Sequence, residues 1–241
     1  MPRGRAPRYE TQREQILARA AELFAQHGYT ATTMNQVAQA CGVSKPSLYH
    51  YVRDKYQLLV EIAEQHVQRL TAVVGRIEAL GLEPSQRLRL LIDSFMVVYA
   101  DAQADHHVLT EDVKFLELAD RERILRGQRL VVEAFAGAIA QGHPHLHAAQ
   151  LHKPLATLLF GMLNWMHTWV QPGGRLRHAD LAPIVIDLFL GGLCAVRGPA
   201  GAADARLRAP GGCAPIGPGS KDRADPTPHD DSRTIGLETK Q

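Results

Sequence analysis

The segment from Lys45 to Val52 carries polar side chains whose types and spacing suit contacts with a nucleic acid. In a helix, Leu48 and Val52 lie four residues apart on one buried face. The side chains left to face outward are Lys45, Ser47, Tyr49 and Tyr51. Ammonium and hydroxyl groups donate hydrogen bonds to base edges and phosphate oxygens, so this face predicts contacts with DNA. Tyr49 is alternatively a packing residue.

The segments around these side chains have the order of a helix-turn-helix. Ser44 can cap the short helix, and Pro46 is tolerated because the first turn of a helix has no partner for its N–H group. A glycine-containing turn at 42–43 precedes the cap, and another short helix is expected over 34–40. A slim helix placed in this way can enter a major groove about 12 Å wide.

The chain around this unit is expected to be helical as well. From Thr11 to about Val196, apolar residues recur at spacings of three and four, without sustained alternation, and this predicts an all-α fold. Candidate capping boxes pair Thr11 with Glu14, Thr33 with Gln36 and Asp54 with Gln57, and Gly28 and Gly42 are expected to end the first two helices. The expected helices cover about 12–27, 34–40, 45–52, 54–80, 85–103, 108–117, 120–141, 147–170 and 179–196.

The charge of the chain is unevenly distributed. The formal net charge is +2, but residues 1–55 carry eight Lys and Arg against four Asp and Glu, whereas residues 56–196 carry twelve against fifteen. The positive excess therefore lies in the N-terminal quarter, where it would meet a polyanion. The basic start of the chain, with Arg3, Arg5 and Arg8, is either an arm for the minor groove or a disordered leader.

Composition places the chain among cytoplasmic proteins without a membrane span. No apolar stretch reaches the length of a transmembrane helix, and no signal peptide is expected. The cysteines Cys41, Cys194 and Cys213 are too few and too scattered for a disulfide framework or a zinc site. The expected division is a basic flexible arm over 1–10, a helix-turn-helix DNA-binding domain over 11–55, a helical effector-binding and dimerisation domain over 56–196, and a disordered Gly- and Pro-rich tail over 197–241.

Residues 11–59 resemble the DNA-binding domain of the TetR family of transcriptional regulators. The family's motifs appear as Phe24-Ala25-Gln26-His27-Gly28-Tyr29, as Thr33-Met34-Asn35-Gln36-Val37-Ala38, and as the run from Gly42 through Arg53-Asp54-Lys55 to Leu58-Leu59. Tyr51 stands where the family often has His, and Val52 where it often has Phe. The resemblance implies a three-helix helix-turn-helix head, joined by a long helix to a C-terminal helical body that binds a ligand and dimerises.

This resemblance also implies a role for each matching residue. Lys45 and Ser47 would reach base edges, and Pro46 would contact a thymine methyl group. Tyr49 and Tyr51 would bind phosphate through their hydroxyl groups. The other implied DNA-binding residues are Ser44, which caps the recognition helix, Thr33, which anchors the start of the second helix, and Lys55, which meets phosphate or is simply a solvated charge.

The body is implied to contain the dimer interface and the effector site. The segments 147–170 and 179–196 correspond to the family's dimerising helices, and their small and apolar residues belong either to that interface or to an intrachain core. Aromatic and polar residues that would line a ligand pocket, or else form ordinary core, are Phe95, Tyr99, Phe115, Phe160, Asn164, Trp165, His167 and Trp169. The resemblance implies a transcriptional repressor that binds palindromic operator DNA as a homodimer and is released by a small effector.

The effector expected from the resemblance is an acyl-CoA thioester such as phenylacetyl-CoA, with no bound cofactor. The segment from Phe160 to Trp165 and the start of the chain resemble the family's acyl-CoA-responsive branch, nearest to repressors of phenylacetate catabolism. Arg121, Arg123, Arg126 and Arg129 would meet the CoA phosphates or form a solvated helix face. The alternatives are a drug-like or metal effector, and more remotely a thioester-acting enzyme. No metal site is expected at the histidines between His143 and His152, because they lie in a Pro-containing loop.

Overall fold

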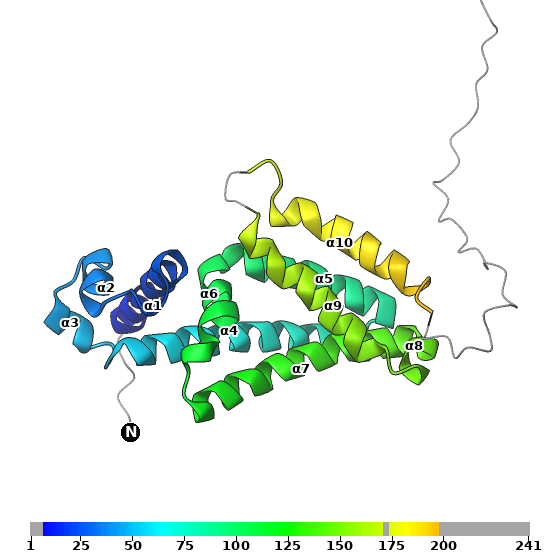
Figure 1. Cartoon of the computed structure of the whole chain (residues 1–241), viewed down its shortest axis with the longest axis horizontal. Coiled ribbons are helices and arrows are strands. Elements are labelled where there is room, and N and C mark those ends of the chain that lie inside the picture. The colour runs from blue at the N-terminus through cyan, green and yellow to red at the C-terminus, as the bar shows by residue number, and fades with distance from the viewer. Residues whose placement is uncertain (1–6, 171–173, 198–241) are drawn as a thin grey trace, which may run out of the picture. The chain divides into compact units, whose positions relative to one another are not determined.

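A computed structural model describes residues 7–170 and 174–197 of the chain. Within these residues all regular structure is helical, which confirms the all-α prediction (Figure 1). The helices are α1 (Pro7–His27), α2 (Met34–Ala40), α3 (Lys45–Tyr49), α4 (Lys55–Glu78), α5 (Pro84–Asp101), α6 (Gln103–His107), α7 (Leu118–Gly142), α8 (Pro144–Ala148), α9 (His152–Trp165) and α10 (His178–Leu193). Most of the predicted arm and the predicted tail from 198 onward lie outside the described residues.

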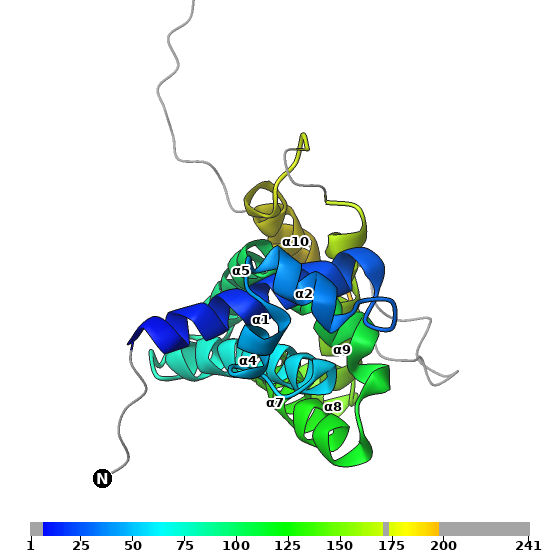
Figure 2. The ribbon, with the colours of Figure 1, turned by 90° about the vertical axis from the view of Figure 1, so that its left-hand side faces the viewer.

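Caps and glycines define the three-helix head formed by α1, α2 and α3. Thr33 forms the predicted capping box, because its hydroxyl accepts from the Gln36 N–H and the Gln36 side chain accepts from the Thr33 N–H. Gly28 and Gly42 end α1 and α2 with φ angles of 82° and 65°, in the left-handed region that glycine adopts without strain. Figure 2 looks onto this head, with α1, α2 and the start of α4 in front.

The start of α1 differs from the prediction. The described helix already includes Pro7, so Thr11 lies inside it and the predicted capping box with Glu14 is wrong. The five additional residues of helix have a physical role here, because Tyr9 packs on the C-terminal end of the recognition segment. A tertiary contact of this kind leaves no trace in local capping signals.

The long helix α4 connects the head to the body. Asp54 caps it by accepting from the Gln57 N–H at 2.7 Å, while the Gln57 side chain accepts from the N–H of Arg53 rather than that of Asp54. Its buried face runs from Leu58 to Ile77 and packs against α1, α5 and α7. A movement of α4 therefore reaches both the head and the body.

The body differs from the prediction at two places. The helix expected over 147–170 is interrupted: α8 ends at Ala148, Gln150 takes a positive φ of 59°, and α9 begins at His152. The helix expected over 108–117 is a π-helical turn, Val108–Asp112, that follows α6 and leads into a 3-10 turn. Single π turns are rare and frequently lie at functional sites.

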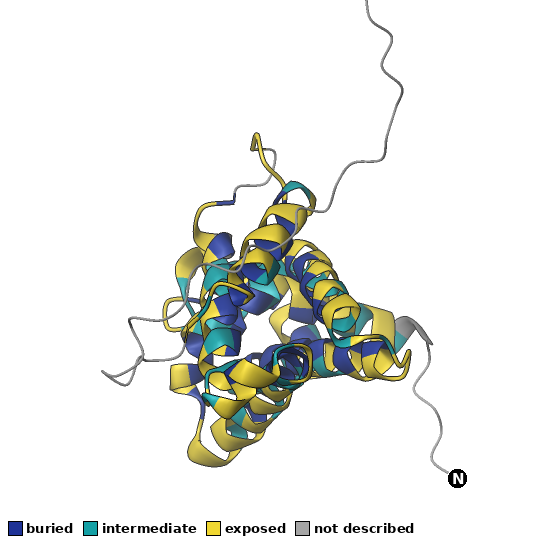
Figure 3. Ribbon diagram, turned by 90° about the vertical axis from the view of Figure 1, so that its right-hand side faces the viewer, coloured by how far each residue is buried: buried dark blue, intermediate teal, exposed yellow. Residues whose placement is uncertain are grey.

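The apolar core joins all these elements. α9 packs mainly on α7 and α10 mainly on α5, while α4, α5 and α7 pack on one another. The buried residues gather on the sides of the helices that face one another (Figure 3). One continuous cluster extends from Ile16 in the head to Leu193 in the body, so the two parts share a core.

Candidate nucleic-acid interface and effector cavity

The recognition helix α3 presents the expected face to solvent. Leu48 and Val52 are buried beneath it, whereas Lys45, Pro46 and Tyr49 are exposed. Ser47 is half-buried, and its N–H is bound at 3.2 Å by the hydroxyl of Ser44, the cap of the helix. The outward cation and hydroxyl groups lie on a short, capped helix, which is the geometry that base and phosphate contacts require.

Tyr51 is held by an aromatic contact from α1. Its ring stacks on that of Tyr9, with centroids 4.8 Å apart and an angle of 27° between planes, and the Tyr9 hydroxyl donates to the carbonyl of His50 at 3.2 Å. Tyr9 therefore joins the start of α1 to the end of the recognition segment. Sequence patterns gave no signal for this residue because it lies outside the helix-turn-helix motif.

Lys55 is engaged differently from the expected phosphate contact. Its ammonium group donates to the carbonyls of Tyr29, Thr30 and Thr32 at 2.8, 3.2 and 2.8 Å, and it lies 4.4 Å from the centroid of the Tyr29 ring. Burial lowers the pKa of Lys55 below its ordinary value. A phosphate contact would require the ammonium group to give up one of these bonds, since it has three donors.

A cavity of about 230 Å³ lies inside the body between α4, α5, α6, α7 and α9. Of the predicted pocket residues, Tyr99, Phe160 and Asn164 line it, and the Tyr99 hydroxyl donates to Asn164 Oδ1 at 3.1 Å. Phe95 is fully buried behind them, with its ring 6.0 Å from that of Tyr99. The remaining lining residues are Val67, Leu70, His106, Leu109, Thr110, Gln128, Val131 and Val132.

Three of the predicted pocket residues lie elsewhere. Trp165 and Trp169 are 66% and 49% exposed and do not line the cavity. Phe115 is also exposed and packs on Tyr29 of the head, with ring centroids 5.4 Å apart. Aromatic residues near the end of α9 face outward because the helix presents Phe160 and Asn164 to the cavity, and side chains one residue further along point away. The side chain of His167 is outside the described residues.

A pair of buried histidines adjoins the cavity and was not expected from the sequence. His66 Nε2 on α4 lies 3.2 Å from His106 Nδ1 on α6, and the His106 ring stacks on Tyr99 at 3.8 Å. Burial, with a smaller contribution from Arg69, lowers the pKa of His66 to about 3, so this imidazole is neutral at physiological pH. The available signal was that His66 interrupts the apolar stripe of α4 between Ile62 and Leu70.

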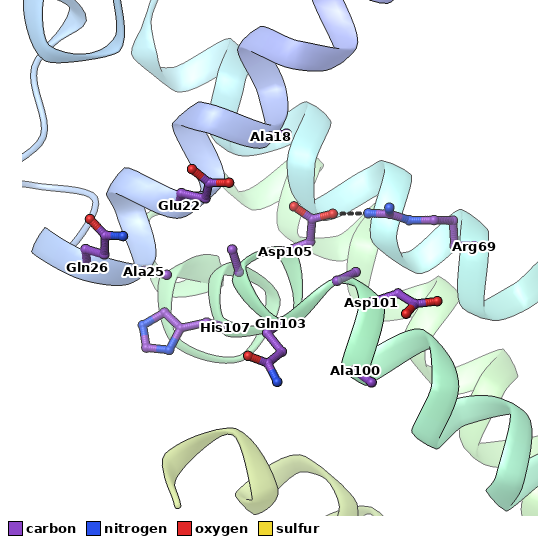
Figure 4. A pocket seen from close by; sticks show the side chains of 12 residues that line it. Ala18, Glu22, Ala25, Gln26, Arg69, Ala100, Asp101, Gln103, Asp105 and His107 are labelled. Carbon is purple, nitrogen blue, oxygen red and sulfur yellow. Dashed lines mark hydrogen bonds and ion pairs between the residues drawn. The ribbon is translucent and has the colours of Figure 1, made fainter. Parts of the chain in front are cut away.

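An open hollow of about 670 Å³ lies at the junction of the head and the body (Figure 4). Glu22 and Gln26 of α1 line one side, and Gln103 and His107 of α6 line the other. Asp105 of α6 forms an ion pair with Arg69 of α4 at its edge. The helix α6 thus lies between the cavity and the first helix of the head.

The outer side of the body carries an apolar groove between α9 and α10. Its lining residues are Leu155, Leu158, Met162, Leu188, Phe189, Gly192, Leu193 and Val196. Leu158 and Leu188 are each 64% exposed. Ala182 and Ile186 of α10 are buried within the chain and belong to its core. Phe189 and Leu193 are buried but also line the groove, and Gly191 and Gly192 are exposed.

Neither a metal site nor a membrane-spanning helix is found among the described residues. No group of three or more His, Cys, Asp or Glu side chains there is arranged to hold a metal ion, although the rings of His147 and His152 lie 4.7 Å apart. None of the described helices has the length and apolar character needed to cross a bilayer.

Comparison with known proteins extends over both parts of the chain. Residues 16–62 match the family described as bacterial regulatory proteins, tetR family, and residues 81–193 match the tetracyclin repressor-like C-terminal domain. The transcriptional activator FasR of Mycolicibacterium smegmatis is 36% identical over 92 residues, which span 38% of this chain and 42% of FasR. The transcriptional repressor KstR2 of the same organism is 24% identical over 78% of this chain and 93% of KstR2.

Solved structures agree with these matches. The crystal structure of a TetR-family transcriptional regulator from Bordetella parapertussis 12822 is 30% identical, with a TM-score of 0.71, over 77% of this chain and 97% of that one. AibR, solved in complex with isovaleryl coenzyme A and operator DNA, shares the fold at 24% identity, with a TM-score of 0.65, over 73% of this chain and 97% of AibR. With its capped recognition helix, central α4 and helical body, the chain belongs to the TetR family of bacterial transcriptional regulators.

Proposed function

We propose that this protein is a transcriptional repressor that binds palindromic operator DNA as a homodimer and is released by an acyl-CoA thioester such as phenylacetyl-CoA. The observation that carries the proposal is the pairing of an exposed polar recognition helix with an internal cavity that α4 connects to it. A relative that aligns over nearly its whole length, KstR2, is a repressor.

The surface of α3 supports operator binding by base and phosphate contacts together. Lys45 and Ser47 would donate to base edges, and the hydroxyls of Tyr49 and Tyr51 would donate to phosphates. One short helix reads only a few base pairs, so two copies about 34–36 Å apart would be needed on a two-fold operator.

The groove between α9 and α10 supports the homodimer. Leu158 and Leu188 leave a large apolar area exposed in one chain, and such areas on helices commonly mark interfaces. A second copy of the same groove, related by a two-fold axis, would cover it by helix packing.

The cavity supports an effector with a compact, largely apolar end. An engineered protein cavity of about 150 Å³ binds benzene, so the volume of about 230 Å³ suits a phenylacetyl-sized group rather than a whole coenzyme. The nucleotide would then lie outside, where Arg121, Arg126 and Arg129 are exposed on α7. AibR, which has the same fold, was solved with an acyl-CoA and operator DNA bound.

The test is a fluorescence-anisotropy titration of the dimer on DNA from its own promoter, with and without phenylacetyl-CoA and other acyl-CoA thioesters. We expect a thioester to weaken binding at least tenfold, and Lys45→Ala to weaken it in the absence of effector. Unchanged affinity with every thioester would exclude the acyl-CoA effector, and the absence of any promoter fragment bound in preference to random DNA would exclude the repressor.

A further inference from the structure

The effector cavity is connected to α4 by a continuous chain of four side chains, of which Tyr99, His106 and His66 are buried and Asn164 is half-buried. Asn164 of α9 accepts from the hydroxyl of Tyr99 of α5 at 3.1 Å, and the Tyr99 ring stacks on His106 of α6 with centroids 3.8 Å apart and 27° between planes. His106 Nδ1 lies 3.2 Å from Nε2 of His66 on α4. Tyr99, His106 and Asn164 line the cavity, whereas His66 lies behind its wall.

We propose that these four side chains form a relay, in which an effector oxygen engages Tyr99 or Asn164 and the rearrangement passes through His106 to His66 and so to α4. This inference rests on the proposed function, because it names the residues through which the cavity regulates the DNA-binding head. The observation that carries it is the unbroken contact from the cavity wall to the helix that bears the head.

Burial makes the members of this chain depend on one another. Tyr99 is 4% exposed, His106 3% and His66 0%, so bulk water does not replace a bond that one of them loses. A buried polar group without a partner costs about 1–3 kcal/mol. A ligand oxygen that accepts the hydrogen bond of the Tyr99 hydroxyl therefore displaces Asn164, and any accompanying shift of the phenol ring displaces the imidazole stacked on it.

Proton counting imposes a second constraint. The Tyr99 hydroxyl has one proton, which it donates in its hydrogen bond to Asn164, and Nε2 of His66 and Nδ1 of His106 can share only one N–H···N bond. Rotation of the His106 ring consequently breaks or redirects the single bond that joins α6 to α4 at this level. The change is discrete, because the bond is either made or lost.

The other contacts of α6 carry the same movement to the head. Arg69 pairs with Asp105 three residues along α4 from His66, and α6 packs on α1. The π turn that follows α6 supplies Leu109 and Thr110 to the cavity wall and leads into a 3-10 turn whose Phe115 packs on Tyr29 of the head. A shift of α6 would therefore displace α1 and the loop to which Lys55 donates its hydrogen bonds.

The decisive variant is His66→Leu, because this residue does not line the cavity. Operator affinity is measured by fluorescence anisotropy with and without phenylacetyl-CoA, and binding of phenylacetyl-CoA to the DNA-free protein is measured by calorimetry. We expect the variant to bind operator DNA alone, and phenylacetyl-CoA alone, with affinities within about threefold of those of the unmodified protein. Phenylacetyl-CoA should weaken operator binding at least tenfold less in the variant than in the unmodified protein. Gln68→Leu, an exposed position on the same helix, is the matched control and should respond normally.

A conservative variant separates the relay from simple packing. His66→Gln keeps an N–H donor toward His106 and should recover most of the release by phenylacetyl-CoA, which a purely steric role of the ring would not predict. Full release in His66→Leu would overturn the relay. Loss of response in Gln68→Leu as well would also overturn it, because the effect would then belong to α4 in general.

The relay can be tested independently of whether phenylacetyl-CoA is the effector. If phenylacetyl-CoA leaves the unmodified protein on its operator, the effector assignment is wrong, and the relay is decided without ligand by a double-mutant cycle of His66→Leu with Asn164→Leu. Their effects on the unfolding equilibrium in urea should be non-multiplicative, although the two side chains are not in contact. Multiplicative effects would overturn the relay.

Discussion

At the scale of the residue, Lys55 and Tyr9 show that tertiary contacts determine the structural role of a side chain. The ammonium group of Lys55 is bound by three carbonyls of the loop after α1, so in this structure it holds the head to the start of α4. Tyr9 supports the ring of Tyr51 from outside the helix-turn-helix motif. Both residues contribute to where the recognition helix lies without facing outward from it.

Tyr9 provides a test of that support. Tyr9→Ala removes a stacked ring pair and a hydrogen bond, each worth about 0.5–1.5 kcal/mol, and we expect operator affinity to fall about five- to thirtyfold because Tyr51 is no longer held. Tyr9→Phe keeps the stack and should lose less than about fivefold. Fluorescence anisotropy measures both. An equal loss in the two variants would assign the effect to the hydroxyl bond with His50 instead of the stack.

His66 makes the stability of the fold depend on pH. The folded chain keeps this imidazole neutral down to a pH of about 3, whereas the unfolded chain binds a proton near pH 6.5. The unfolded state therefore binds more protons between these values, and the free energy of unfolding must decrease as the pH falls below about 6.5. We expect a loss of about 1.4 kcal/mol between pH 7.5 and 5.5, measured by urea unfolding. His66→Leu should flatten this dependence, and an unchanged slope would contradict the assignment.

At the scale of the element, the close approach of α4 and α7 depends on one glycine. A Cβ placed on Gly127 would overlap Cγ1 of Val67, a stiff β-branched side chain that also lines the cavity. The neighbouring π turn contributes to the same cavity, because it places Leu109 and Thr110 in the cavity wall. Helix packing around the cavity thus depends on one residue without a side chain, Gly127, and on one irregular turn of helix, the π turn.

Gly127 and Gly137, two glycines in the interior of α7, form a matched pair for testing this packing. Gly127→Ala should destabilise the fold by about 1–3 kcal/mol, as overpacking of a close contact does. Gly137→Ala has open space around the added methyl group and should stabilise it by about 0.5–1 kcal/mol through helix propensity. Urea unfolding followed by circular dichroism measures both effects. Stabilisation by both substitutions would show that Val67 moves aside without cost.

At the scale of the whole molecule, the regions proposed to bind DNA, a second copy and an effector lie at separate places. The recognition helix lies in the head, the apolar groove lies between α9 and α10, and the cavity lies between α4 and the helices that pack on it. One continuous buried cluster extends from Ile16 to Leu193, so the described head and body share an apolar core. This shared core would transmit the coupling proposed between these regions.

The groove gives a test at this scale. Leu188→Glu places a charge on the face proposed for dimerisation, where burying it without a partner is costly, so light scattering should show a monomer and operator affinity should drop more than tenfold. Leu118→Glu on α7 is the control, since Leu118 is 73% exposed and lies outside the groove. A dimer that survives Leu188→Glu would place the interface elsewhere.

The sequence by itself determined the helical class, the caps and the orientation of the recognition helix, because these depend on residues within one turn of each other. Thr33, Ser44, Gly28 and Gly42 act through local hydrogen bonds and φ angles, and the structure confirms each. Only the tertiary structure decided which aromatic residues face the cavity, and it joined His66 to His106 across forty residues of chain. Such long-range pairs depend on helix packing, and local periodicity contains no information about which buried faces meet.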